Sequence, residues 1–220
     1  MIRAMTRAEV CRQIEAVGIV PVIRAPSPEL AVQAAEAILA GGISVFEITM
    51  TVPDAPEVIR LLRARLGERA LIGAGTVLDA KGALACIEAG AAFIVSPGFD
   101  AGTVALAHEA GIPAMPGALT PTEVITAWQA GADVVKIFPA SALGGASYLR
   151  ALKGPLPQVK LMPTGGVNLN TVRDFLAAGA VALGVGSELV DLAALLAGRA
   201  DVLTQRASEF VAAVAAARGA

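Results

Sequence analysis

The sequence predicts one α/β domain over residues 1–220, built as a (β/α)8 TIM barrel with an extra helix before the first strand. Helical and strand-like segments alternate with a spacing of about 20–25 residues, which is typical of a βα repeat. Ala-Gly-Gly or Ala-Gly-Ala ends four of the helical segments, at residues 40–42, 89–91, 130–132 and 178–180. Eight strand-like segments can be counted, which is the number that closes such a barrel.

Each predicted strand is a short apolar segment bounded by Pro, Gly or polar residues. The first reads Ile-Val-Pro-Val-Ile-Arg, and the sixth reads Asp-Val-Val-Lys-Ile-Phe and ends at Pro139. The eight expected strands cover residues 19–24, 44–50, 71–74, 93–96, 113–116, 133–138, 159–164 and 181–186.

The predicted helices begin at residues whose side chains cap a helix N-terminus, and they end at Gly. The extra first helix spans about residues 7–17, and the last helix spans about residues 201–218. Caps are expected at Ser27, Asp54, Asp79, Asp100, Thr120 and Asn168 or Asn170, with further helical segments at 141–152 and within 187–196.

A doubly wound open sheet is the alternative arrangement of alternating strands and helices. Its nucleotide-binding form carries the pattern Gly-x-Gly-x-x-Gly directly after a strand. Gly73 and Gly75 match the first two glycines, but Leu78 stands at the third position. The barrel is therefore the preferred prediction.

The composition limits the possible partners. Of the 220 residues, 55% are hydrophobic and only 16% are charged, so most helices and strands must bury one face. The net charge of −2 and the lack of a Lys/Arg cluster argue against nucleic acid as a partner. No apolar segment is long enough to span a membrane, and the N-terminal residues lack the apolar core of a signal peptide. We therefore expect a cytoplasmic protein without a membrane partner.

Metal chemistry is not indicated by the sequence. His108 is the only histidine, and Cys11 and Cys86 lie far apart without the spacing of metal ligands. A single histidine also leaves no room for a His-rich metal site. We expect no metal and no cofactor.

Lys136 is the most unusual charged residue of the chain. Of the four lysines, it alone is flanked by apolar residues on both sides, within the sixth predicted strand. Burying an ammonium group is costly unless the group pairs with a carboxylate or loses its proton. A neutral lysine can attack a carbonyl carbon and form a Schiff base. Lys136 is therefore either the nucleophile of an enzyme or half of a structural ion pair.

Glu47 is a second charged residue within an apolar strand, the second of the eight. Strands two and six lie opposite each other in an eight-stranded ring, so an inward Glu47 would approach an inward Lys136. A carboxylate beside an amine can combine proton transfer with capture of a carbonyl group. The alternative is a buried ion pair that only holds the barrel together.

Glycines follow the last two strands, at Gly165-Gly166 and at Gly186-Ser187. Barrels often bind phosphate at these two positions through backbone N–H groups, and glycine permits the close approach. Ordinary turn glycines are the alternative. Arg24 is the one arginine at a predicted strand end, suited to a carboxylate or a phosphate, unless it is a surface residue before a Pro-rich loop.

Seven segments together give the chain a resemblance to a known family. It resembles the class I aldolases that cleave 2-keto-3-deoxy-6-phosphogluconate (KDPG) and the related 4-hydroxy-2-oxoglutarate (KHG) aldolases. The resemblance covers nearly the whole chain, from Val20 to Ser187. The segments are GG at 41–42, FEIT at 46–49, IGAGTV at 72–77, IVSPG at 94–98, MPG at 115–117, VKIFPA at 135–140 and PTGGV at 163–167.

The resemblance implies a role for each of these matching residues. Lys136 is then the lysine that forms the Schiff base, and Glu47 is the general acid/base, acting through a water. The implied substrate-binding residues are Arg24, Thr49, Thr76, Pro97, Phe138 and Thr164, and the implied phosphate-binding residues are Gly165, Gly166, Gly186 and Ser187.

One position departs from part of the family. Some members carry an arginine where this chain has Thr51. Other members carry an arginine on the first strand, as this chain does with Arg24. We infer that Arg24 supplies the missing charge near the substrate carboxylate or phosphate.

The resemblance implies a cytoplasmic homotrimer that needs no metal. The implied reaction is the cleavage of 2-dehydro-3-deoxy-6-phosphogluconate to pyruvate and glyceraldehyde 3-phosphate. The implied further substrate is 4-hydroxy-2-oxoglutarate. One alternative is an aldolase for the epimeric 2-dehydro-3-deoxy-6-phosphogalactonate, although several members with that role carry an apolar residue at the position of Thr164. The other alternative is a non-catalytic phosphate-binding barrel or a trimeric assembly block. The presence of both Lys136 and Glu47 speaks against it.

Overall fold

The computed structural model describes residues 5–219. Residues 1–4 and 220 of the predicted domain lie outside it. The prediction that the N-terminal segment is not a signal peptide falls partly on these residues. The strands are β1 Ile19–Ile23, β2 Val45–Thr49, β3 Leu71–Gly75, β4 Ile94–Val95, β5 Ala114–Met115, β6 Gly117–Ala118, β7 Val135–Ile137, β8 Leu161–Pro163 and β9 Leu183–Val185. The helices are α1 Arg7–Val17, α2 Pro28–Ala40, α3 Ala55–Leu66, α4 Ala80–Glu88, α5 Ala101–Glu109, α6 Pro121–Gln129, α7 Ala146–Lys153, α8 Val172–Ala177, α9 Leu192–Leu196 and α10 Asp201–Arg218, with 3-10 turns η1 Gly67–Arg69 and η2 Ala140–Leu143.

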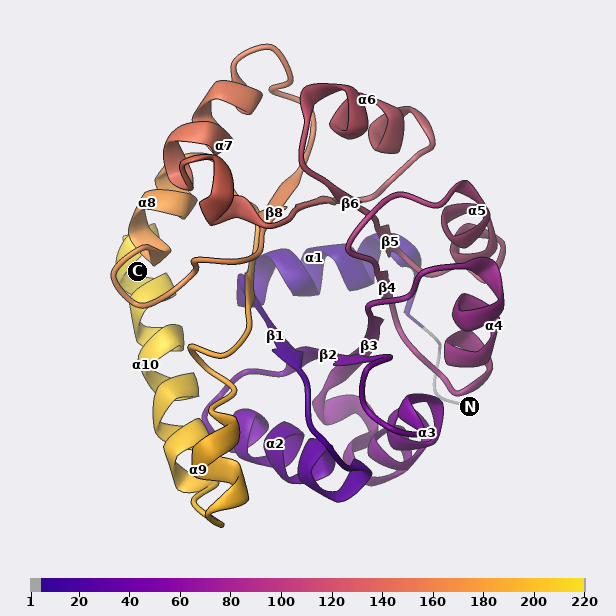
Figure 1. The fold of residues 1–220 in the computed structure, drawn as a ribbon, viewed down its shortest axis with the longest axis vertical. Coiled ribbons are helices and arrows are strands. Elements are labelled where there is room, and N and C mark those ends of the chain that lie inside the picture. Colours follow the sequence, from indigo (N-terminus) through magenta and orange to yellow (C-terminus); the bar gives the residue numbers. More distant parts are fainter. Residues whose placement is uncertain (1–4, 220) are drawn as a thin grey trace.

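The strands form a curled parallel sheet in two parts. Six strands pair in the order β5-β4-β3-β2-β1-β9, and three pair in the order β6-β7-β8. Figure 1 shows the strands curling around a common centre with helices α2 to α10 on the outside. From β5 to β1 the strand order follows the sequence without reversing, whereas a doubly wound sheet reverses at a switch point. The doubly wound strand order is therefore not that of this chain.

Two apolar clusters occupy the two faces of the sheet, because alternate residues of a strand point to opposite faces. One cluster lies between the strands and the outer helices and includes Phe46, Ile72 and Val135. The other lies inside the curled sheet and includes the residues that precede these three in the chain. Its members are Val20, Val45, Leu71, Phe93, Val95, Met115, Val134, Met162 and Ala182, together with Val10 and Ile14 of α1.

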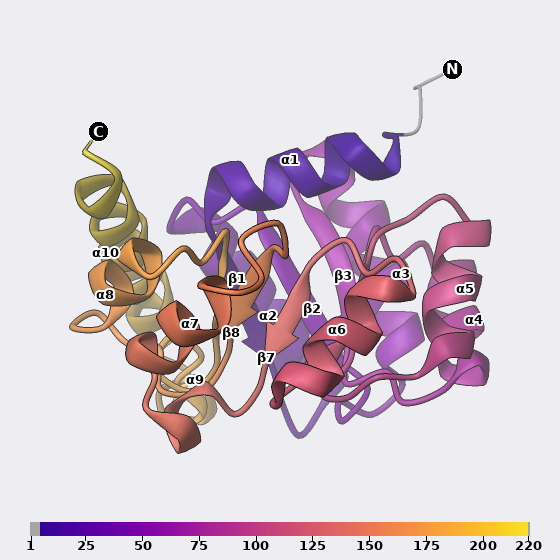
Figure 2. The same ribbon diagram turned by 90° about the horizontal axis from the view of Figure 1, so that it is seen from above.

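Helix α1 therefore covers the N-terminal end of the sheet interior. Thr6 and Glu9 form a capping box at its start, and Gly18 ends it with a left-handed φ of 74°. Figure 2 shows α1 lying across one end of the strands. Beneath it, Phe93 fills the space beside Gly73, where an added Cβ would come within 2.2 Å of the Phe93 ring. This end of the interior is closed by packed apolar side chains.

The predicted elements are confirmed in type, and several bounds differ. The first and last helices have the predicted ranges, and Ser27, Asp79, Asp100 and Thr120 cap their helices as expected. Within the fifth predicted strand, 113–116, the structure has β5 at Ala114–Met115, and a second short strand, β6, follows Pro116 at Gly117–Ala118. Proline has no N–H to donate, so it interrupts the ladder there.

Asp54 is the residue before α3, as predicted, but it is in a left-handed conformation, φ 52°, and its side chain makes no cap hydrogen bond. The predicted cap of α8 is wrong. Neither Asn168 nor Asn170 is the residue before α8, which is Thr171. The Asn168 side chain instead accepts a hydrogen bond from the backbone N–H of Asn170, closing a local Asx turn before the helix.

Candidate active site

Lys136 and Glu47 meet inside the curled sheet. Glu47 lies two residues after Val45 on β2 and Lys136 two residues after Val134 at β7, so both share the inward face with those apolar residues. The distance from Lys136 Nζ to Glu47 Oε1 is 3.6 Å, and the side chains are only 4% and 1% exposed. This contact confirms the predicted approach across the interior.

The Glu47 carboxyl group is poorly satisfied by its surroundings. Among the described residues, neither of its buried oxygens has a hydrogen-bond partner, and 3.6 Å to Lys136 is longer than a normal hydrogen bond. Burial raises the pKa of Glu47 above its ordinary value, while the positive charges of Lys136 and Arg24 pull that pKa down. The carboxyl group is therefore able to hold a proton in the folded protein.

Glycine at position 75 makes room for this carboxyl group. Gly75 ends β3, beside β2, and pairs with Thr49 in the ladder. An added Cβ at Gly75 would come within 2.5 Å of Glu47 Oε1, so any larger residue would displace the carboxyl group. The sequence interpretation did not assign this role to Gly75. The sequence does carry a signal for this role. Gly73 and Gly75 both face inward on one strand, and the neighbouring strand carries the charged residue Glu47.

A pocket of about 200 Å³ opens at the C-terminal ends of the strands, beside this pair. It brings together seven of the predicted site residues: Arg24, Phe138, Thr164, Gly165, Gly166, Gly186 and Ser187. Val22, Val167, Gly184 and Glu188 complete the lining. The Phe138 ring also lies 5.5 Å from Lys136 Nζ, a cation–π distance that connects the pocket with the lysine.

Thr164 presents an unsatisfied hydroxyl group at this pocket. The residue is 5% exposed, and its Oγ1 has no hydrogen-bond partner within residues 5–219. A parallel bridge places it beside Gly184, where an added Cβ would lie only 2.0 Å from that oxygen. Because an unpaired buried hydroxyl is costly, Thr164 is suited to a hydrogen bond with a bound molecule.

The glycine loops supply backbone donors to the same pocket. Gly165 and Gly166 have φ angles of +92° and +76°, a region that side chains disfavour. In the part of the chain that the structure describes, the N–H groups of Gly166, Ser187 and Glu188 donate no hydrogen bond within the protein. Grouped N–H donors of this kind form a concavity that fits an anion.

The remaining predicted residues lie around the pocket rather than in it. Thr76 follows β3 with a φ of 58° and lines a separate hollow beside α4 with Met50 and Val77. Pro97 lines a hollow of about 450 Å³ that shares Phe138 with the pocket. Thr49 is fully buried, and its hydroxyl donates to the Ile23 carbonyl.

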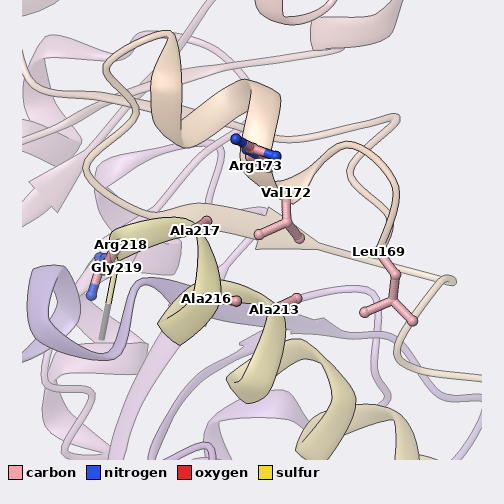
Figure 3. Close-up of a pocket in the computed structure, with 8 residues that line it drawn as sticks. All are labelled: Leu169, Val172, Arg173, Ala213, Ala216, Ala217, Arg218 and Gly219. Carbon is pink, nitrogen blue, oxygen red and sulfur yellow. The ribbon is translucent and has the colours of Figure 1, made fainter.

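A larger hollow of about 640 Å³ lies between α8 and α10, away from the strand ends (Figure 3). Its lining is mostly alanine and aliphatic side chains, with Arg173 and Arg218 as its charged residues. The Arg218 guanidinium already donates to the carbonyl oxygens of Glu15 and Ala16. Among the described residues, the lining of this hollow includes no nucleophile or carboxylate, so the pocket beside Lys136 is the better candidate for chemistry.

Residues 5–219 contain no cluster of three or more His, Cys, Asp and Glu side chains arranged to hold a metal ion. Over the same residues, no helix combines the length and apolar character needed to cross a bilayer.

Comparison with known proteins decides the family. A family model described as KDPG and KHG aldolase matches residues 10–205. The chain belongs to the KDPG and KHG aldolase family. It is 40% identical to the KHG/KDPG aldolase of Escherichia coli (strain K12) over 193 residues, which cover 88% of this chain and 90% of that protein.

Solved structures of this aldolase family agree with the fold. The KDPG aldolase from Legionella pneumophila, with pyruvate captured at low pH as a covalent carbinolamine intermediate, matches with a TM-score of 0.83 and 33% identity, covering 90% of this chain and 96% of that one. A cube-shaped, porous protein cage designed by fusing symmetric oligomeric domains also contains a similar chain. There the TM-score is 0.82 and the identity 31%, covering 92% of this chain and 73% of that one.

Proposed function

We propose that the protein is a class I aldolase that cleaves 2-dehydro-3-deoxy-6-phosphogluconate to pyruvate and glyceraldehyde 3-phosphate. The observation that carries the proposal is the buried Lys136–Glu47 pair, 3.6 Å apart, beside a pocket with an arginine and a ring of backbone donors. A buried ion pair stabilises a fold only when its carboxylate is also fully hydrogen-bonded. The Glu47 carboxyl group makes no hydrogen bond within the described chain. Family membership supports the same chemistry.

The proposed reaction begins with Lys136. Burial raises the pKa of Glu47, so its carboxyl group can hold a proton for the reaction, and the amine of Lys136 is the nucleophile. The amine attacks C2 of the keto acid, and its proton passes to the former keto oxygen to give a carbinolamine. The protonated carboxyl group of Glu47 donates its proton to the departing hydroxyl group, so water leaves, an iminium ion forms and Glu47 remains as a carboxylate. The iminium ion is the electron acceptor for the following step.

Glu47 is the proposed general acid/base for the carbon–carbon cleavage. As a carboxylate, and through a water, it takes the proton of the C4 hydroxyl group. The C3–C4 bonding electrons pass to the iminium group, so C4 becomes the aldehyde carbon of glyceraldehyde 3-phosphate and an enamine remains. Glu47 returns the proton to C3, and water hydrolyses the resulting iminium ion to pyruvate and the free amine of Lys136.

The substrate is held by the pocket at the strand ends. Gly165, Gly166, Gly186 and Ser187 are the proposed phosphate site, supported by the undonated N–H groups around them. Thr164 offers its unpaired hydroxyl to a substrate hydroxyl group, and Arg24 offers its charge to the carboxylate or the phosphate. Thr76, Pro97 and Phe138 are proposed contacts around the keto acid, whereas the hydroxyl of Thr49, predicted as a further contact, is already bonded to the Ile23 carbonyl oxygen.

We also propose that the two parts of the sheet form one closed eight-stranded barrel. β5 and β6 are separated only by Pro116 and count as one strand. On the other side, parallel bridges join Leu161 with Ala180 and Thr164 with Gly184, which connects β8 with the segment of β9. Residues 1–220 then form a single aldolase domain.

For its assembly, we propose a cytoplasmic homotrimer that needs no metal or other cofactor and binds neither nucleic acid nor membrane. The support for assembly is the similarity to a chain of the cage made from symmetric oligomeric domains. Light scattering of the purified protein tests it, with the mass of three chains expected. A monomer at micromolar concentration would contradict it.

The proposed chemistry is tested by trapping. Borohydride added together with pyruvate should attach the pyruvate carbons to one lysine per chain, and peptide mass analysis should place them on Lys136. Labelling of another lysine, or no labelling, would favour the non-catalytic phosphate-binding barrel instead. A cleavage assay with the two epimeric phosphorylated sugar acids and 4-hydroxy-2-oxoglutarate then identifies the preferred substrate.

A further inference from the structure

The ends of β1 and β2 are joined by a side chain where their backbone pairing stops. The last paired residues are Ile23 on β1 and Ile48 on β2. One residue further, Thr49 Oγ1 donates a hydrogen bond of 3.0 Å to the Ile23 carbonyl oxygen. Thr49 is fully buried on the inward face, two residues from Glu47. Its hydroxyl hydrogen is therefore used inside the protein.

Thr51 supports this hydroxyl from the other side. Val52 N–H donates to the Thr49 carbonyl oxygen at 3.0 Å, which closes a turn and brings the hydroxyl of Thr51 to 2.7 Å from that of Thr49. A hydroxyl has one hydrogen to donate, and that of Thr49 goes to Ile23. Thr51 must therefore be the donor to Thr49. The result is a chain of two hydrogen bonds from exposed Thr51 to the buried end of β1.

This chain ends on the peptide group that leads into Arg24. The Ile23 carbonyl belongs to the bond between Ile23 and Arg24, so its orientation sets the direction in which the arginine leaves the strand. Arg24 lines the pocket, and its charge acts on Glu47. Among the described residues, two charged groups act on the Glu47 carboxyl group, Lys136 on β7 and Arg24 after β1. The neighbouring strand β3 contributes only the uncharged Gly75 at this place.

We propose that Thr49, supported by Thr51, is a positioning residue that holds Arg24 at the active site and does not itself contact the substrate. The proposal rests on the proposed aldolase function. Thr164 gives the contrast within the same molecule. Its hydroxyl has no partner among residues 5–219 and lines the pocket, whereas the hydroxyl of Thr49 is already used.

The test compares two threonine-to-valine substitutions that differ in what they remove. Thr49→Val deletes the hydrogen bond to Ile23 with little change of shape. Thr103→Val is the matched control, because Thr103 is equally buried, lies on α5, and has a hydroxyl without a partner in the described residues. Thr49→Ser keeps the hydroxyl and should restore the wild-type values.

For Thr49→Val we expect KM for the 2-keto acid to rise about tenfold with a smaller change in kcat, which is the size of one lost hydrogen bond. The acid limb of the kcat/KM profile should also move to higher pH, because a displaced Arg24 lowers the pKa of Glu47 less. Thr103→Val should change neither quantity. A merely structural threonine would not move the pH profile.

Three further measurements make the test decisive. In an Arg24→Gln background, Thr49→Val should add no further effect on KM, whereas a full additive effect would overturn the proposal. If Thr49→Val does not fold, Thr51→Val at the exposed end should give a smaller shift in the same direction, and no shift would overturn the proposal.

Pyruvate–borohydride labelling of the wild type separates the proposed function from the positioning role of Thr49. Without labelling, the proposed function and this inference both fail; with labelling, equal KM and pH profiles in Thr49→Val and Thr103→Val overturn only this inference.

Discussion

At the end of the strands that α1 covers, the inward residues are apolar and fully packed, from Val20 and Val45 to Phe93 and Met162. At the opposite end the same strands carry Glu47, Lys136 and Thr164, and two of these have buried polar atoms without a partner in the described chain. The alternation along each strand is the same at both ends. The difference shows that the covered end supplies stability, while the open end keeps unpaired polar groups that a bound substrate can satisfy.

The largest expected effect is at the open end. Lys136→Arg keeps the positive charge but cannot form an imine, so cleavage activity and pyruvate labelling should both disappear while the protein remains folded. The matched control is Lys160→Arg, because Lys160 pairs with Glu15 on the surface and should be replaceable. Substantial cleavage by Lys136→Arg would remove the distinction between the two ends.

The second substitution separates imine formation from proton transfer. Glu47→Gln keeps the shape of the side chain and removes the base, so cleavage and pyruvate proton exchange should fall about 10²–10⁴-fold. Labelling by pyruvate and borohydride should survive, because the amine remains. Wild-type exchange rates in this variant would assign the proton transfer to another group.

The third substitution tests the covered end. Ile14→Ala removes a fully buried side chain of α1 from the inner cluster and should lower the free energy of unfolding by about 2–5 kcal/mol. Its kcat/KM at a temperature where it is folded should equal that of the wild type. Denaturant unfolding and a cleavage assay measure the two quantities, and a tenfold loss of kcat/KM would show that the two ends are coupled.

The fourth comparison concerns pH and the buried pair. In Lys136→Met, Glu47 has a folded pKa above 4.5, so the folded chain keeps a proton that the unfolded chain releases. Stability should therefore be complete below about pH 4.5 and decline as pH rises toward the folded pKa, by up to about 1.4 kcal/mol per pH unit.

The control for this comparison removes both partners. Glu47→Leu with Lys136→Met should lose the extra pH dependence and be as stable as the wild type, or more stable by about 1–4 kcal/mol. Urea unfolding at pH 5 and pH 8 measures all three proteins. Identical pH dependence of the single and double variants would show that Glu47 is not the titrating group.

The smallest expected effect concerns the phosphate site. Ser187→Ala should remove one hydrogen bond to the phosphate and cost about 1–3 kcal/mol in kcat/KM for the phosphorylated substrate. The same variant should treat an unphosphorylated analogue as the wild type does. Equal losses for both substrates would place the phosphate elsewhere.

Much of this site could be predicted from the sequence because it depends on strand order and alternation. A charge inside each of two apolar strands was enough to bring Lys136 and Glu47 together. The role of Gly75 was missed, because it depends on which of the two inward-facing glycines of β3 faces the Glu47 side chain across the ladder. The hydroxyl direction of Thr49 and the Thr171 start of α8 depend on local turns that apolar periodicity does not describe.

Helix α1 has a consequence for the order of events in the proposed reaction. Because it covers one end of the interior together with packed apolar residues, substrate, products and hydrolytic water share the opposite end, at the C-terminal ends of the strands. Glyceraldehyde 3-phosphate, lying between the enamine and that end, must depart before water reaches the bound carbons. Release is therefore sequential, with the aldehyde first and pyruvate last, and in steady-state kinetics pyruvate competes with the substrate for the empty enzyme.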